Sequence, residues 1–148
     1  MYNHILVAID LSPKSNCALS HAIKLAHFFN SKITLINVHE EFLNKKEMIM
    51  SRVSVDSLQK TYKDISLKAK SEITHLLNDL HAEDIETNIL LREGNASEEI
   101  LKLSDEISPD LIVIGSNGED SLSDYFIGTT SNHIVDKSNI PVLVIPVI

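Results

Sequence analysis

Short apolar runs alternate along the chain with longer segments whose apolar residues recur every three or four positions. Runs of this length, bounded by turn residues, are typical of strands buried on both faces of a parallel sheet. The longer segments have the period of amphipathic helices. The pattern predicts strands at residues 4–9, 33–38, 86–92, 111–114 and 142–145.

Two of the expected helices have clear start signals. Ser12 is placed to cap the first helix, with Pro13 at its first helical position. Asn95 opens another helix, and Glu98 stands three residues later, as in a capping box. The start of the longest helix is left open because the pattern of residues 40–52 is mixed. Helices are expected at about 13–29, 58–80, 95–107 and 129–137.

This order of elements predicts an α/β protein. Strands and helices that alternate, joined by right-handed crossovers, form an open doubly wound, Rossmann-like sheet of five parallel strands with helices on both faces. We expect residues 1–148 to form a single domain of this kind. Ligands of such sheets bind at the carboxyl ends of the strands, where the strand order reverses. The first and fourth strands would meet there, so Asp10 and Gly115 are expected to face a common crevice.

Composition narrows the classes of function. The chain has 13 Lys+Arg against 21 Asp+Glu, a net charge of −8. This balance argues against a nucleic-acid partner, because phosphate backbones are bound by clustered basic side chains. No apolar run approaches the roughly 18 residues of a membrane span, so no membrane association is expected. Cys17 is the single cysteine, which excludes an internal disulfide and a multi-cysteine zinc site. We expect a cytoplasmic protein, and composition identifies no protein partner.

Glycines are concentrated at the end of the fourth predicted strand. The chain has only four glycines, and three of them form the pattern Gly115-Ser-Asn-Gly118, nine further residues, and then Gly128. Gly128 opens a predicted helix, whose unpaired N–H groups and dipole favour an anion, and the hydroxyls of residues 129–131 could add donors. On spacing alone this segment is either a phosphate cradle or two ordinary turns followed by a capped helix.

The pattern Gly115-x-x-Gly118-x9-Gly128-Thr129 resembles the nucleotide-binding signature of the universal stress protein family. The likeness extends along the whole chain, through the segments HILVAIDLS, Val38-His39, REGNASEEI, SPDLIVIGSNG and IPVLVIP. The resemblance implies a doubly wound α/β fold, binding of an adenine nucleotide (ATP or AMP), and homodimers.

The resemblance also implies roles for individual residues. Asp10 and Val38 would contact the ribose or the adenine, and Ala8 and Ile114 would line the base pocket. The residues implied to hold the ribose and the phosphates are Gly115, Asn117, Gly118, Gly128, Thr129 and Thr130.

No group in the sequence can be assigned as a general base, an activated nucleophile or a metal cluster. We therefore expect a dimeric sensor or regulator of a stress response. Its catalytic activity would be slow ATP hydrolysis at most. The alternative is a protein-interaction module of the same fold that binds no nucleotide, since many nucleotide-binding members have a basic residue where this chain has Asn117. A phospho-acceptor receiver domain fits poorly, because Asp10 lacks an acidic neighbour and Pro146 follows the last strand instead of a lysine.

The last predicted strand, Val142–Ile145, is apolar and falls at an end of the chain, where a doubly wound sheet has an edge. An apolar edge strand is a liability unless it is paired or covered. We expect this strand to pair with its symmetry mate in a homodimer, as the resemblance also implies.

The segment between the glycine turns has three carboxylates, Glu119, Asp120 and Asp124, and no basic residue. This excess of negative charge generates a prediction about metal dependence. These carboxylates would repel a triphosphate unless Mg²⁺ or Mn²⁺ lay between them. Asp10, Asp120 and Asp124 are the candidate metal contacts. ATP affinity should therefore depend more steeply on the divalent cation than AMP affinity does. Titrations of both nucleotides in EDTA and then in magnesium measure this; equal dependence would leave the carboxylates as solvated surface.

Overall fold

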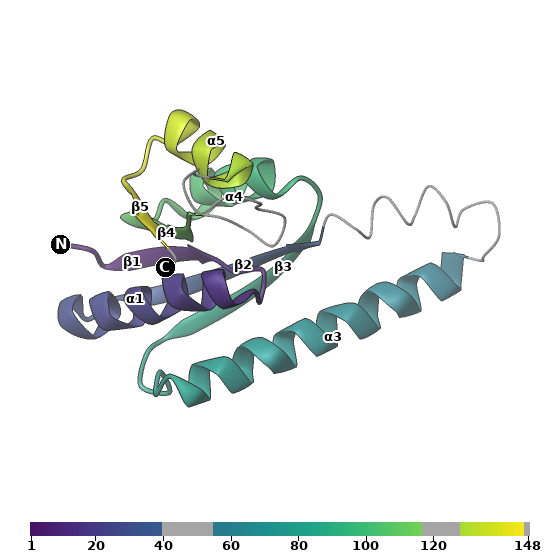
Figure 1. Cartoon of the computed structure of the whole chain (residues 1–148). Coiled ribbons are helices and arrows are strands. Elements are labelled where there is room, and N and C mark those ends of the chain that lie inside the picture. The colour runs from purple at the N-terminus through teal and green to yellow at the C-terminus, as the bar shows by residue number, and fades with distance from the viewer. Residues whose placement is uncertain (40–54, 117–127, 147–148) are drawn as a thin grey trace.

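The computed structural model describes residues 1–39, 55–116 and 128–146 and has a five-stranded parallel sheet (Figure 1). The strand order is β3-β2-β1-β4-β5. The strands are β1 (His4–Ala8), β2 (Lys32–His39), β3 (Thr87–Glu93), β4 (Leu111–Gly115) and β5 (Val142–Ile145). The helices are α1 (Pro13–Phe29), α3 (Val55–Asp79), α4 (Ala96–Ile107) and α5 (Thr129–Lys137). The predicted fold class is confirmed.

The sheet is doubly wound about β1. The chain runs outward from β1 through β2 to β3, then returns to place β4 on the other side of β1, where Val7 is in register with Val113. Helices α1 and α3 cover one face of the sheet, and α4 and α5 cover the other (Figure 1). The strand order therefore reverses between β1 and β4, as the sequence predicted.

Alternation along the strands builds one core on each face of the sheet. Side chains of odd-numbered β1 residues pack with alanines of α1, whose small size allows the helix to lie close to the sheet. Even-numbered β1 residues pack with α4 and α5. The α1/α3 core includes Ile5, Val7, Ala18, Ala22, Ile33, Leu35 and Ile73. The α4/α5 core includes Leu6, Ala8, Ile36, Ile100, Leu103, Ile112, Ile114 and Ile134.

Both predicted helix caps form. The Ser12 hydroxyl accepts from the Ser15 N–H at 3.2 Å, and Asn95 Oδ1 accepts from the Glu98 N–H at 3.1 Å. The longest helix starts at Val55, and the mixed segment before it, residues 40–54, lies outside the described residues. No helix in the described part of the chain is both long and apolar enough to cross a membrane.

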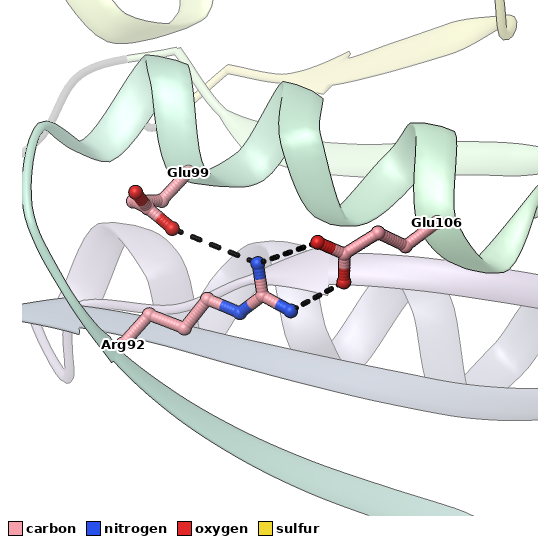
Figure 2. A network of polar contacts seen from close by, with 3 residues as sticks. All are labelled: Arg92, Glu99 and Glu106. Atoms are coloured by element: carbon pink, nitrogen blue, oxygen red, sulfur yellow. Dashed lines mark hydrogen bonds and ion pairs between the residues drawn. The ribbon is translucent and has the colours of Figure 1, made fainter.

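Arg92 joins the edge strand β3 to helix α4 (Figure 2). Its guanidinium contacts Glu106 at 2.6 Å and Glu99 at 3.6 Å. The turn between β3 and α4 passes through Gly94 at φ 147°, where a Cβ would lie 3.1 Å from the Glu99 side chain. A side chain at position 94 would therefore strain the backbone and crowd this network. The hydrogen bond from Arg92 lowers the pKa of the Glu106 carboxyl below its ordinary value.

The Arg92–Glu106 pair predicts a pH-dependent contribution to stability. Because the pKa of Glu106 is lowered on folding, its contribution is present above the ordinary value of 4.5 and is lost as the pH falls below it. Glu106→Gln should reduce the free energy of unfolding slightly at pH 7, and the difference from the parent should vanish in acid. Urea unfolding across this pH range measures the effect, with Asp105→Asn, an exposed carboxylate of the same helix, as control. A difference that does not change with pH would contradict this account.

Candidate functional site

The candidate site lies at the carboxyl edge of the sheet, where β1 and β4 end side by side. The helix that follows β1 packs on one face of the sheet, and α5, the next helix after β4, packs on the other. Because the two connections leave in opposite directions, this edge is the place where open sheets of this kind bind ligands. The predicted site residues that the structure describes all lie at this edge.

Asp10 organises the turn between β1 and α1. Its Oδ1 accepts from the Ser12 N–H at 2.9 Å, and its own N–H donates to the Ser15 hydroxyl at 3.2 Å. Leu11 between them has φ 66°, a left-handed conformation that costs free energy for a residue with a side chain. The Asp10 side chain is exposed. It therefore has a structural role in the turn, and its contact with a ligand stays a prediction.

Three of the predicted site residues share one face of the sheet. Ala8 and Ile114 are buried at the ends of β1 and β4, and Val38 on β2 is half-buried against the same α4/α5 core. They come from three adjacent strands in the order β2-β1-β4. This arrangement provides a continuous apolar floor beside the strand ends.

Ser116 ties the end of β4 to the start of α5. Its N–H donates to the Ile145 carbonyl at 2.9 Å, and its own carbonyl accepts from the Gly128 N–H and, at 2.9 Å, from the Ser131 hydroxyl. Ser131 is 2% exposed. The expectation that the Ser131 hydroxyl adds a donor for a ligand is therefore wrong, because that hydroxyl is used inside the protein.

The amino end of α5 has backbone donors that the helix itself leaves without an acceptor. Gly128 is the N-cap and has no side chain to cap the helix, and the first helical bond runs from the Asn132 N–H to the Gly128 carbonyl at 2.9 Å. The N–H groups of residues 129–131 precede that bond and have no acceptor in the preceding helical turn. Together with the positive end of the helix dipole, they suit an anion. Thr129 is exposed and Thr130 half-exposed at this end.

Backbone conformation does not explain the glycine at position 128. Its φ of −61° and ψ of 161° are open to any residue. Among the glycines in the described ranges, only Gly94 has a positive φ. What glycine provides at position 128 is therefore an N-cap that adds no side chain beside the first N–H groups of α5.

Part of the predicted signature is not described. Asn117 and Gly118, together with Glu119, Asp120 and Asp124, lie outside the described residues. Asp10 is the one candidate metal contact that can be placed. Within residues 1–39, 55–116 and 128–146, no group of three His, Cys, Asp or Glu side chains could hold a metal ion.

The structure adds one residue that the sequence interpretation missed. Asn37 on β2 is 4% exposed, and its Nδ2 donates to the Ile9 carbonyl at 2.7 Å. Its Oδ1 is buried and has no hydrogen-bond partner among the residues that the structure describes. The only signal in the sequence is an amide side chain inside an apolar run, residues 33–38.

Comparison with known proteins places these features in a family context. The model of the universal stress protein family matches residues 1–146. The universal stress protein MJ0577 of Methanocaldococcus jannaschii is 27% identical over 154 residues, covering 98% of this chain and 95% of that protein. The universal stress protein YxiE of Bacillus subtilis is 28% identical, covering 98% of this chain and 99% of that protein.

Solved structures agree on the fold. The structure of MJ0577 has a TM-score of 0.80 at 24% identity, covering 98% of this chain and 96% of that one. A universal stress protein in complex with cAMP has a TM-score of 0.63 at 20% identity, with coverage of 97% and 96%. The universal stress protein from Archaeoglobus fulgidus in complex with dAMP has a TM-score of 0.63 at 18% identity, with coverage of 97% of each chain.

Proposed function

The chain belongs to the universal stress protein family, and on that premise we propose that it binds an adenine nucleotide, ATP or AMP, at the carboxyl edge between β1 and β4. The observation that carries the proposal is the amino end of α5, whose first N–H groups have no acceptor within the helix; it is held against the end of β4 through Ser116, and its N-cap residue has no side chain. Two structural neighbours that share this fold are complexes with the adenine nucleotides cAMP and dAMP.

The site offers each part of a nucleotide a suitable surface. The adenine would lie against the apolar floor made by Ala8, Ile114 and Val38. The ribose would face Asp10, and the phosphates would accept from the backbone N–H groups of Thr129 and Thr130. With ATP, Mg²⁺ or Mn²⁺ would offset the negative charge, with Asp10 as one candidate contact.

The function that follows is regulation rather than rapid catalysis. Among the proposed site residues in the described ranges, Asp10 alone has an ionisable side chain, so no acid–base pair is formed there. A protein of this kind would respond to the nucleotide concentration in the cytoplasm through the conformation of the carboxyl edge of its sheet. We infer a role as a nucleotide-responsive regulator of a stress response.

Substitution of Gly128 tests the site. Gly128→Val fits the backbone conformation at this position but places two methyl groups beside the open N–H groups. It should weaken ATP and AMP binding about tenfold or more, because loss of a hydrogen bond to a charged group costs about 1.5–3 kcal/mol. Isothermal titration calorimetry measures the effect, and Asn132→Val, at an exposed position of the same helix, is the matched control.

Two results would contradict the proposal. Parent protein that binds neither ATP nor AMP at millimolar concentration, with and without magnesium, would favour the interaction module. Parental affinity in Gly128→Val would place the nucleotide elsewhere.

We also propose that β5 forms a homodimer contact. Within the described part of the chain it lies at the edge of the sheet and pairs with β4 on one side only. Val142 and Val144 pack inward against the α4/α5 core, whereas Leu143 is 36% exposed on the other face. A second copy of β5 would satisfy the free edge and cover Leu143.

Leu143→Lys is therefore the clean test of the dimer, since Val144→Asp would place a charge against the core. The variant should sediment as a monomer at concentrations where the parent is a dimer, with an unfolding temperature close to that of the parent. Phe28→Lys, at an 82% exposed position of α1, should remain dimeric. A parent that is monomeric at every concentration, or a dimeric Leu143→Lys, would contradict the β5 contact.

A further inference from the structure

Asn37 is a polar side chain on the apolar face of a central strand. It has the same parity on β2 as Ile33 and Leu35, so it lies on the α1/α3 face of the sheet. The side chain of Asn37 lies 2.7 Å from the Ile9 carbonyl, and because a carbonyl oxygen can only accept, the atom of the amide in this contact is Nδ2. The other amide atom, Oδ1, is buried and has no donor among the described residues. A half-satisfied amide is less stable there than an apolar side chain, so packing does not account for it.

The hydrogen bond from the Asn37 side chain takes the place of the next backbone hydrogen bond between β1 and β2. The registered pairs of β1 and β2 end at Ala8 and Ile36, and the last bond between the strands runs from the Ile9 N–H to the Ile36 carbonyl at 2.9 Å. In a parallel ladder the following bond would join the Val38 N–H to the Ile9 carbonyl. That carbonyl accepts the Asn37 amide instead.

The Val38 N–H is directed toward the candidate site. The Ile33 N–H donates to Glu86, at the start of β3, so odd-numbered residues of β2 bond toward β3 and even-numbered ones toward β1. Val38 is even-numbered, and its N–H therefore points to the side where β1 has just ended. Ile9 is followed directly by Asp10 and by Leu11 in its left-handed conformation. The Asn37 bond thus lies where the ladder stops and the β1–α1 turn begins.

We propose that Asn37 is a positioning residue, which ends the β1–β2 ladder one bond early and so keeps the Val38 N–H and the Asp10 turn open to the ligand. This inference rests on the nucleotide site proposed above. Asn37 lies on the opposite face from Ala8 and Val38 and does not touch the ligand; it acts through the Ile9 carbonyl. The buried, unpaired oxygen of Asn37 lowers the stability of the fold, and the Val38 N–H stays available as a donor at the edge of the sheet.

Asn37→Leu separates this role from ordinary packing. In the variant the Ile9 carbonyl is released and can accept the Val38 N–H, so amide exchange at Val38 should become slower than in the parent. Its unfolding temperature should equal or exceed that of the parent. Nucleotide affinity should fall by about tenfold or more, as expected for loss of a hydrogen bond with the ligand. Asn37→Val gives the same test with a smaller, β-branched side chain if leucine overpacks the site.

Thr34→Val is the matched control. Thr34 is also a buried polar residue of β2, 3% exposed, but its hydroxyl pairs with His4 Nε2 at 2.7 Å near the amino end of the strand. Its substitution should leave nucleotide affinity and Val38 exchange at parental values.

Parental affinity in folded Asn37→Leu, or Val38 exchange that is unchanged or faster, would overturn the role of Asn37. The exchange measurement uses nucleotide-free protein. It therefore decides the positioning role even if the parent binds no nucleotide, a result that would overturn the proposed function separately.

Discussion

The pairing of β1 with β4 at the centre of the sheet is the constraint on which the rest of the structure depends. It brings together residues more than a hundred positions apart, with Ile5 opposite Leu111 and Val7 opposite Val113. Because the helices that follow these strands pack on opposite faces, the pairing puts the reversal of strand order, where sheets of this kind bind ligands, at this carboxyl edge. The apolar floor, the Asp10 turn and the amino end of α5 all take their positions from this one contact.

The sequence predicted those features that local patterns determine. The spacing of apolar residues placed α5 at Thr129–Lys137 as observed and the five strands to within a residue or two. Capping chemistry identified Ser12 and Asn95, because a cap needs only a few adjacent residues. The interactions that escaped prediction join distant segments. Arg92 reaches along α4 to Glu106, and Asn37 reaches across to Ile9, and no local period indicates either contact.

The candidate site was predicted by resemblance more than by physics, and the structure shows what the residue pattern alone could not. Gly128 has an ordinary backbone conformation, so its value lies in adding no side chain at the helix end. Ser131, a possible donor by its type, is used to hold α5 against β4. Unfavourable local features of the described residues gather at the same edge: the left-handed Leu11, the unpaired Asn37 oxygen and the amino end of α5, whose N-cap makes no side-chain hydrogen bond. Features that lower stability in this way are expected at a site where function requires them.

The central claim is that an adenine nucleotide occupies the carboxyl edge, and a titration of ¹⁵N-labelled protein with AMP followed by amide chemical shifts tests it most directly. The account predicts saturable shifts at Asp10, Val38, Gly115, Thr129 and Thr130, at the ends of β1, β2 and β4 and the start of α5. Residues at the amino end of the sheet, such as Lys32 and Asn88, should not shift. Saturating AMP without shifts at the carboxyl edge, or with shifts centred on the amino end, would contradict it.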